Sequence, residues 1–565
     1  MSLHRASQLS TFAETNGSTS RDEDLSPSES WREDASELFT AAQLPSGRYI
    51  PNRLVKVAMY EHMSALFGGP PNDAHLKLYA RWAEGGWGMV CTGNVQVCED
   101  HLSLGRDVVV PARLTPETIE PFTCLARAIH YGSAEGAEGN GEKRTVAVLQ
   151  LSHPGRQSTN IIGGRWPFAP PVAPSAVPVG RRTADGEGSA SALLSRLVHT
   201  VFFQTPRPMS LSDISDVVES FVRGAELAVA SGFDGVQLHA AHGYLISQFM
   251  SPKTNRRIDE YGAPENALRF LHDIVSAIRD NDKIPDEFIL GIKLNAADYV
   301  DHGGSDRAPP VDSNHNEENQ ALEHVRQIAE WEMLDFMEVS GGDYEDPAFM
   351  TKTTSPRQAY FTEFAHEVKQ MIASQFPKPP LILLTGGLRT LPLMSSVLKH
   401  GHADLLGIGR LSVLCPDLPR TLEAAMTGDL TTDRFPMEPL PEPDLESPVV
   451  APSRRSSLQH ARALFFHIQA YMLARSWALL PVRLPPLVGA GTAMAWYMVT
   501  MRRVAAQEPV DYSVGGVEAV LRMWLWLAPD SRGCRGLVDG VLESWWGMGV
   551  VGVLLGFVLG IGLPI

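Results

Sequence analysis

Basic residues are scarce relative to acidic ones. The 565 residues contain 48 Lys and Arg against 65 Asp and Glu, a formal net charge of -17. Affinity for a nucleic-acid backbone comes from clustered Lys and Arg, and the sequence has no such cluster. We therefore expect no nucleic-acid partner.

Cysteine is also sparse, and no two cysteines stand in a C-x-x-C arrangement. This absence argues against a zinc site, an iron–sulfur cluster or a redox dithiol. Few cysteines in so long a chain fit a reducing compartment, so we expect a cytoplasmic catalytic domain with buried, inert thiols. The five are Cys91, Cys98, Cys124, Cys415 and Cys534.

The first 40 residues lack an apolar run of the kind that follows the start of a secretory signal. They are rich in Ser, Glu, Asp and Thr and poor in aromatic residues. This composition predicts a disordered leader over 1–40. The pattern changes after it, and residues 41–435 are predicted to form one large domain.

Within 41–435, strand-length apolar runs alternate with longer segments of helical periodicity, which is typical of βαβ units. Eight such runs predict closure into a (β/α)8 barrel, an α/β fold of the TIM type. The predicted strands are 54–59, 88–93, 145–151, 233–239, 288–294, 334–340, 381–386 and 404–409. The predicted helices are 74–85, 117–131, 212–231, 265–280, 321–332, 361–375 and 391–400.

Local signals refine this outline. Ser212 before Asp213 and Pro116 before Glu117 are predicted helix starts. Three inserts rich in Gly, Ser and Asp are too polar to pack and are interpreted as surface loops. They cover 132–144, 181–196 and 301–320.

The chain beyond the barrel has a different composition. A proline-rich linker is predicted over 436–458 and a tail over 459–565. Two uncharged runs in the tail, 484–501 and 545–565, approach the length that spans a bilayer core. In the second, Gly552, Gly556 and Gly560 place small residues on one helix face. We expect membrane association through this tail, with an amphipathic or disordered appendage, or a mispredicted end, as the alternatives.

Residues 232–262 are the most informative segment. They begin as a strand and end as a polar loop, so His239 and His242 are expected at the C-terminal mouth of the barrel, where such folds place catalytic groups. With Tyr244 just beyond, the two imidazoles could direct N–H groups at one oxygen. A zinc pair is a competing interpretation, although no third ligand with suitable spacing is evident. Polar residues that merely close a barrel end are the other.

Glycines near the ends of the last two predicted strands suggest a phosphate site. Gly386, Gly387 and Gly409 allow backbone N–H groups to approach a dianion closely, and Arg410 adds a charged donor. Barrels commonly hold phosphates at strands seven and eight. Tight turns are the alternative explanation of each glycine motif taken alone.

Taken together, these motifs resemble the old yellow enzyme family of FMN-dependent ene reductases. The run H-A-A-H-G-Y is followed by S-P, N-R-R, D-E-Y-G and P-E-N, and four further segments occur in the order of that family. The resemblance spans residues 45–430 and leaves the leader and the tail unexplained. The four segments are NRLVKVAM (52–59), QLSHPGR (150–156), GIKLNAADY (291–299), and TGGLRT (385–390) with GIGR (407–410).

The resemblance implies bound FMN with Ala58 and Met59 alongside the isoalloxazine ring and Gln150 at its pyrimidine edge. Lys293 would lie near N1 and the C2 carbonyl, where a fixed cation stabilises the charge left by reduction. A surface lysine is the alternative for Lys293. Tyr60 departs from the family, which often has Cys or Thr near the flavin C4 carbonyl, so redox tuning and pocket shape are expected to differ. Ala267 replaces a usual Arg in the P-E-N run.

The implied reaction is a ping-pong cycle in which NADPH or NADH reduces FMN and an α,β-unsaturated carbonyl compound is then reduced by hydride from flavin N5. His239 and His242 would bind the carbonyl oxygen, and Tyr244 would protonate the α-carbon. Two alternatives are a membrane-tethered flavin-binding scaffold with little turnover, and a flavin-free barrel lyase or isomerase that uses the phosphate site for substrate. The physiological substrate, the preferred nicotinamide and the oligomeric state stay open, with a homo-oligomer among the arrangements considered.

Overall fold

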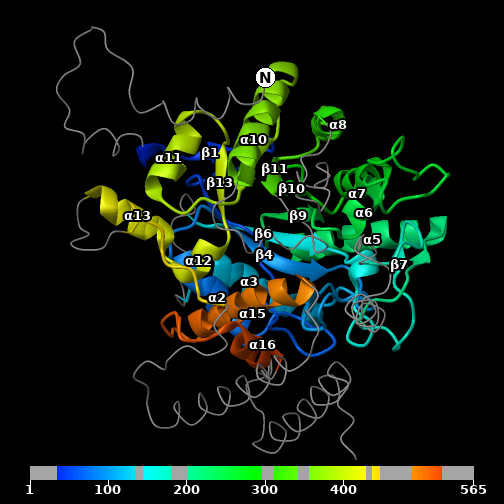
Figure 1. The fold of residues 1–565 in the computed structure, drawn as a ribbon, viewed down its shortest axis with the longest axis horizontal. Coiled ribbons are helices and arrows are strands. Elements are labelled where there is room, and N and C mark those ends of the chain that lie inside the picture. Colours follow the sequence, from blue (N-terminus) through cyan, green and yellow to red (C-terminus); the bar gives the residue numbers. More distant parts are fainter. Residues whose placement is uncertain are drawn as a thin grey trace, which may run out of the picture.

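The computed structural model describes residues 35–133, 144–179, 202–295, 311–340, 356–427, 435–445 and 486–524. Its centre is a closed barrel of eight parallel strands (Figure 1). β3 pairs with both β13 and β4, which closes the ring. The fold is therefore the predicted (β/α)8 barrel, and each strand overlaps one predicted from sequence. The strands are β3 (Leu54–Lys56), β4 (Met89–Gln96), β6 (Val146–Ser152), β9 (Gly235–Ala240), β10 (Ile289–Asn295), β11 (Phe336–Ser340), β12 (Leu381–Thr385) and β13 (Leu405–Ile408).

Helices cover the outside of the barrel and overlap the seven predicted segments. They are α2 (Asp73–Glu84), α3 (Pro116–Tyr131), α5 (Leu211–Ala230), α7 (Arg269–Arg279), α8 (Val311–Glu330), α10 (Pro356–Gln375) and α11 (Leu391–Lys399). Because α8 begins at Val311, the second half of the insert 301–320 is helical and not the predicted loop. Most of the inserts 132–144 and 181–196 lies outside the described residues.

Short elements complete the described chain. At the strand ends and after β13 lie α6 (Leu245–Met250), α12 (Arg410–Leu414) and α13 (Leu418–Thr427). The short strands are β1 (Ala42–Gln43), β2 (Tyr49–Ile50), β5 (Val108–Val109), β7 (Val172–Ala173) and β8 (Arg207–Pro208), and the 3-10 turns are η1 (Glu37–Phe39) and η2 (Gly155–Gln157).

Two helix starts test the capping predictions. Thr115 caps α3, and Pro116 occupies its first turn as expected. α5 instead begins after Ser210, whose hydroxyl accepts from the Asp213 N–H while the Asp213 carboxylate accepts from the Ser210 N–H. The predicted start at Ser212 was wrong because this reciprocal pair satisfies two otherwise unpaired N–H groups two residues earlier.

The predicted leader extends too far. Residues 35–40 include η1, and the Leu38 side chain within it is fully buried in the barrel's apolar core. The Arg53 N–H also donates to the Leu38 carbonyl. The end of the segment 1–40 therefore belongs to the folded domain.

The described part of the tail packs on the barrel. α15 (Pro486–Ala505) and α16 (Gly516–Trp524) contact each other, and α15 contacts α2 and α12 (Figure 1). Trp496 and Met498 are buried in the same apolar cluster as the barrel helices. This packing does not support the lipid-facing role predicted for 484–501, and none of the helices in the described ranges is long and apolar enough to cross a bilayer. The second candidate span, 545–565, lies outside the described residues.

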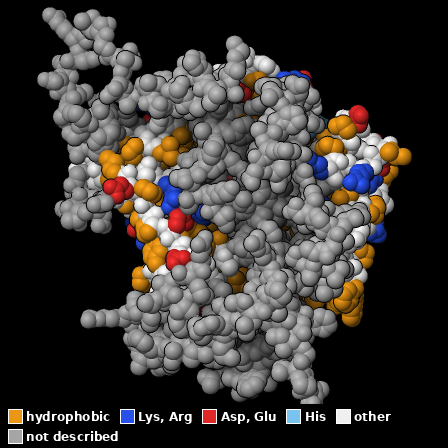
Figure 2. Space-filling model, viewed as in Figure 1, with side chains coloured by type: hydrophobic (Ala, Val, Ile, Leu, Met, Phe, Trp, Pro, Cys, Tyr) orange, Lys and Arg blue, Asp and Glu red, His pale blue; other side chains and the backbone are white. Residues whose placement is uncertain are grey.

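The visible surface is mixed in character. On the face in Figure 2, the described Lys and Arg side chains lie among acidic and hydrophobic ones, without a continuous basic area. This distribution agrees with the acidic net charge of the sequence.

Candidate functional site

Three predicted site residues meet where β9 ends. His239 is the second-to-last residue of that strand. The chain then reverses through His242 and Gly243, which have φ values of 59° and 70°. The reversal brings His242 Nδ1 to 2.9 Å from His239 Nε2. Tyr244 precedes α6, and its ring lies 4.4 Å from that of His239, centroid to centroid. The structure therefore brings these three residues together, and their roles stay a prediction.

Asn94, which sequence reasoning did not single out, joins this group from β4. Its Oδ1 lies 2.9 Å from His239 Nδ1 and accepts from Gln150 Nε2 at 2.5 Å. Its Nδ2 donates to the Tyr244 hydroxyl at 3.1 Å. Ser103 lies 3.3 Å from the same hydroxyl. One buried amide thus contacts three of the predicted site residues.

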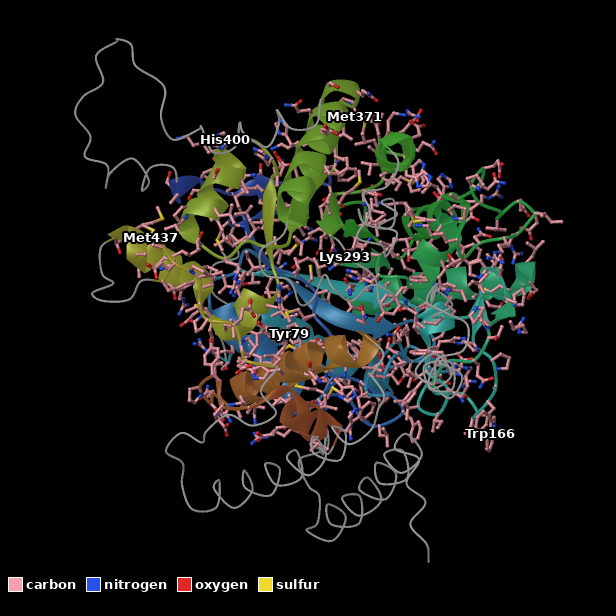
Figure 3. All side chains as sticks on the ribbon, in the orientation of Figure 1. Tyr79, Trp166, Lys293, Met371, His400 and Met437 are labelled. Carbon is pink, nitrogen blue, oxygen red and sulfur yellow. The ribbon has the colours of Figure 1, made fainter. Side chains whose placement is uncertain are left out.

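Lys293 is an interior residue and not a surface lysine. Its side chain is 5 % exposed, and Nζ lies 2.9 Å from the Glu338 carboxylate, which is fully buried. Glu338 also accepts from Gln237 and Thr385, both at 2.8 Å. Figure 3 shows Lys293 in the central, barrel part of the molecule. Glu338 offsets the charge of the buried lysine, and the predicted role of Lys293 beside a flavin ring stays a prediction.

Burial and Lys293 together keep the two imidazoles uncharged. Burial lowers the pKa of His239 well below its usual range, and the positive charges of neighbouring groups lower it further. The pKa of His242 is lowered in the same way, first by burial and then by Lys293. Both rings are therefore neutral at physiological pH, which suits binding of a neutral carbonyl oxygen.

The segment after β3 carries Ala58, Met59 and Tyr60. The Tyr60 hydroxyl is buried and faces the side chain of Asp107. Burial, followed by the charge of Asp107, raises the pKa of Tyr60 well above its ordinary value. The hydroxyl therefore stays protonated at physiological pH.

The tail contacts this segment. Arg502 of α15 donates to the His62 carbonyl at 2.8 Å, and Trp524 of α16 lies edge-to-face with the His62 ring. The His62 ring in turn contacts Tyr60. No local pattern predicted this contact, because 440 residues separate Arg502 from His62.

Glycines follow β12 and β13 at the predicted phosphate site. Gly386 and Gly387 have φ values of 128° and 68°, and no atom lies within 4 Å of a Cβ built on Gly386. A Cβ on Gly409 would meet only Val57 and Met59, at 3.8 and 4.0 Å. Space beside these backbones is what close approach of a phosphate requires.

Two arginines and one carboxylate lie at this end of the barrel. Arg410 follows Gly409, and its Nη1 is 4.0 Å from Glu442, a residue of the predicted linker. Arg389 pairs more closely with Glu442, at 2.9 Å. Tyr497 of α15 donates to the other Glu442 oxygen at 3.0 Å.

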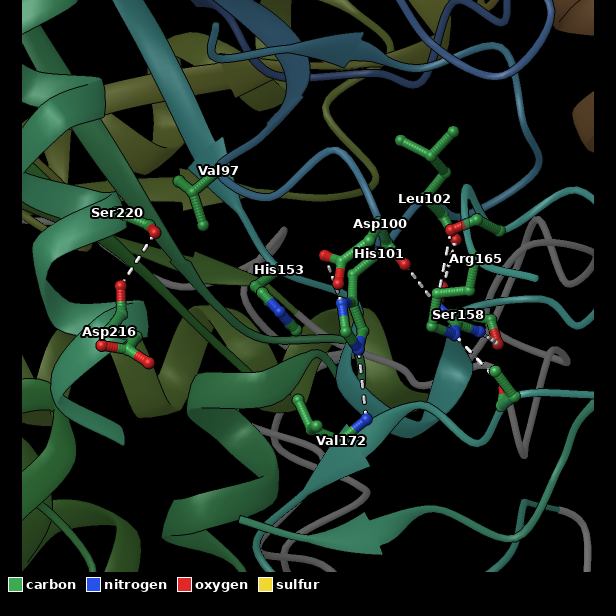
Figure 4. A network of polar contacts seen from close by, with 12 residues as sticks. Val97, Asp100, His101, Leu102, His153, Ser158, Arg165, Val172, Asp216 and Ser220 are labelled. Carbon is green, nitrogen blue, oxygen red and sulfur yellow. Dashed lines mark hydrogen bonds and ion pairs between the residues drawn. The ribbon is translucent and has the colours of Figure 1, made fainter. Parts of the chain in front are cut away.

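A further polar network fixes the loops behind the mouth (Figure 4). The His101 ring bonds Asp100 at 2.8 Å and accepts from the Val172 N–H at 3.1 Å. It also packs on the His153 ring, 4.6 Å away. These contacts tie the loop after β4 to the loop after β6, and so hold the ends of the two strands that carry Asn94 and Gln150.

The residues present fit FMN. Gln150 and Gln237 each have a buried side-chain oxygen with no partner among the described residues, and such acceptors match ring N–H groups. The glycines leave space for a phosphate, and Arg410 supplies charge. In the described residues, by contrast, no group of three His, Cys, Asp or Glu side chains is arranged to hold a metal ion.

A barrel with this mouth and an open, arginine-flanked phosphate end is that of a flavin-dependent oxidoreductase. The model of the NADH:flavin oxidoreductase / NADH oxidase family matches residues 37–428, and the chain belongs to that family. The chain is 35 % identical over 390 residues to the NADH-dependent flavin oxidoreductase iliE of Hypocrea jecorina (strain QM6a), covering 67 % of this chain and 87 % of that protein. It is 36 % identical over 398 residues to the NADH-dependent flavin oxidoreductase iccE of Talaromyces variabilis, covering 68 % and 86 %.

Solved structures share the fold. The old yellow enzyme homologue from Zymomonas mobilis superposes with a TM-score of 0.51 at 22 % identity, covering 71 % of this chain and 95 % of that one. The chain is thus an oxidoreductase that uses FMN and a nicotinamide, NADH or NADPH. This finding sets aside the flavin-free lyase or isomerase. The described part of the tail packs on the barrel, so it does not support the hypothesis of a membrane-tethered scaffold.

Proposed function

We propose that the protein reduces the C=C bond of α,β-unsaturated carbonyl compounds at the expense of NADH or NADPH. FMN, when bound, would supply the two-electron chemistry that connects the nicotinamide with the β-carbon of the substrate. The observation that supports the proposal is the meeting of His239, His242 and Tyr244 within hydrogen-bond and ring-contact distance at the mouth of β9.

His239 and His242 would bind the carbonyl oxygen. Their ring nitrogens are 2.9 Å apart, so an oxygen that displaces this contact can receive hydrogen bonds from both rings once His239 Nε2 carries the proton. Such bonds stabilise the negative charge that develops on the oxygen as hydride reaches the β-carbon. Because both rings are neutral, they would bind the carbonyl oxygen without presenting a full positive charge that attracts anions from solution.

Tyr244 would supply the proton. Hydride adds to the β-carbon and the Tyr244 hydroxyl proton adds to the α-carbon, so the C=C bond becomes a single bond and NAD(P)H becomes NAD(P)⁺. The tyrosinate then regains a proton from solvent. Asn94 donates to the hydroxyl oxygen at 3.1 Å, which stabilises the negative charge left on it.

The test is a His239→Ala, His242→Ala double variant assayed with 2-cyclohexen-1-one. Loss of oxyanion donors costs about 10²–10³-fold each in turnover, so we expect enone reduction to fall by at least that factor. FMN content and the rate of bleaching by NADH or NADPH should stay close to those of the unmodified protein. Unchanged enone kinetics in the double variant would reject the proposal.

A further inference from the structure

Asn94 is the residue through which the proposed carbonyl-binding and proton-donating groups are connected. It is a buried polar side chain near the end of β4, and it contacts one residue each from β6, β9 and the turn before α6. An amide has one accepting and one donating end. The orientation of the Asn94 amide therefore determines which atoms of its neighbours carry a hydrogen and where those hydrogens point.

The contacts specify which hydrogens these are. Asn94 Oδ1 faces His239 Nδ1, so that nitrogen carries the proton and His239 Nε2 is left with a lone pair. His242 Nδ1 then donates to His239 Nε2, and His242 Nε2 accepts from Ser340, 3.4 Å away. In this arrangement His239 offers a lone pair, and not an N–H, to an incoming carbonyl oxygen.

The opposite amide orientation reverses both functions. With Nδ2 toward the ring, His239 Nδ1 accepts and Nε2 gains the N–H that a carbonyl oxygen needs. Oδ1 then faces Tyr244, which donates its hydroxyl hydrogen to Asn94 and not to a substrate carbon. Gln150 must turn as well, because its amide bonds the same end of Asn94.

We propose that Asn94 is a positioning residue whose single amide sets the tautomer of His239 and the hydroxyl direction of Tyr244 together, so that one orientation favours carbonyl binding by His239 and the other leaves the Tyr244 hydrogen for the substrate. The inference rests on the proposed enone reduction for its functional meaning. Its structural part, the control of a ring tautomer, can be measured without substrate.

The variant Asn94→Asp separates the effect of Asn94 on His239 from its effect on Tyr244. A carboxylate accepts at both ends, so it holds the proton on His239 Nδ1 and takes the Tyr244 hydrogen, while its charge favours a second proton on the ring. The other titratable or charged groups facing His239 are His242, Tyr244 and Lys293. β6 presents only Gln150 and Ser152, which do not titrate.

We expect a new pH dependence in Asn94→Asp. The KM for 2-cyclohexen-1-one should fall about tenfold from about pH 8.5 to about pH 6, as the ring gains its Nε2 proton, whereas kcat should be low throughout. In the unmodified protein KM should be flat over this range, because both histidines have pKa values well below 6.5. Ser103→Ala is the matched control: it removes the other contact to Tyr244 and should keep the flat profile.

Nitrogen NMR of selectively ¹⁵N-histidine-labelled holoprotein gives the readout that a purely structural role would not move. At about pH 8.5 the His239 signals, identified by their loss in His239→Ala, should report Nδ1–H in the unmodified protein and in Asn94→Asp, and a mixture of tautomers in the similarly sized Asn94→Leu. An unchanged His239 tautomer in Asn94→Leu, or a flat KM profile in Asn94→Asp, overturns the inference. If the unmodified protein binds FMN but never turns over the enone, the proposed function is wrong. The NMR measurement still decides independently whether Asn94 sets the His239 tautomer.

Discussion

The two ends of the predicted FMN site bind by opposite means. At the mouth of β9, His239, His242 and Tyr244 are held by an uncharged network, and burial keeps both imidazoles neutral. At the phosphate end, Arg410 is about a third exposed and faces the Glu442 carboxylate. On the proposed function, the first end would select a ligand by the direction of its hydrogens, which a fixed, dry network maintains. The second would attract a dianion by charge, which tolerates solvent and movement.

The strongest way to break this comparison is Tyr244→Phe, which deletes one hydroxyl at the neutral end. General acid catalysis contributes about 10²–10⁴-fold, so we expect oxidation of the reduced protein by 2-cyclohexen-1-one to slow by that factor. Reduction by NADH or NADPH should change by less than about twofold, since it needs no proton from this residue. Stopped-flow measurement of the two half-reactions separates them. Equal slowing of both would mean that Tyr244 shapes the whole site and does not donate a proton.

Arg410→Ala tests the charged end. A charge-assisted hydrogen bond contributes about 1.5–3 kcal/mol, so the Kd for FMN should rise by about 10- to 100-fold. Riboflavin lacks the phosphate and serves as the matched ligand. Its Kd, measured by quenching of flavin fluorescence, should not change in the variant. A similar loss of affinity for riboflavin would place the effect of Arg410 in the fold and not at the phosphate.

More of the fold could be predicted from the sequence than of the hydrogen-bond network at the mouth of the barrel. Apolar runs of strand length and the H-A-A-H-G-Y segment are local signals, and the barrel places their ends together. Asn94 gave no such signal. The β4–β6 register shifts between Cys91 and Asn94, so alternation along the strand does not tell which way the Asn94 side chain points. Its partners come from β6, β9 and the turn before α6, and they meet only when the ring closes.

The segment 484–501 was misjudged for a related reason. A low-charge run such as 484–501 has the same composition whether it faces lipid or another helix. What distinguishes the two is the partner, here α2 and α12, which no local pattern in the tail describes. Glu442 was likewise hidden in a proline-rich stretch, because linker composition says nothing about what the segment lies against.

Glu442 gives the smallest and most specific test of the comparison. Its carboxylate pairs with Arg389 and lies 4.0 Å from Arg410, so it shares positive charge that a bound phosphate would use. Glu442→Gln keeps the shape and still accepts from Tyr497. Because exposed charge pairs contribute about 0–1 kcal/mol, the Kd for FMN should fall only about two- to fivefold, and the difference should shrink as salt is raised.

The matched control is Glu438→Gln, which makes the same change of charge four residues earlier in the chain, at a more exposed position. It should leave the Kd for FMN unaltered at every salt concentration. If both variants tighten binding equally, the effect is one of net charge, and Glu442 has no particular relation to the phosphate end. If neither variant tightens FMN binding, the Glu442 carboxylate does not affect the charge available to the phosphate. The phosphate end would then not bind by charge, and the contrast with the neutral mouth would be wrong.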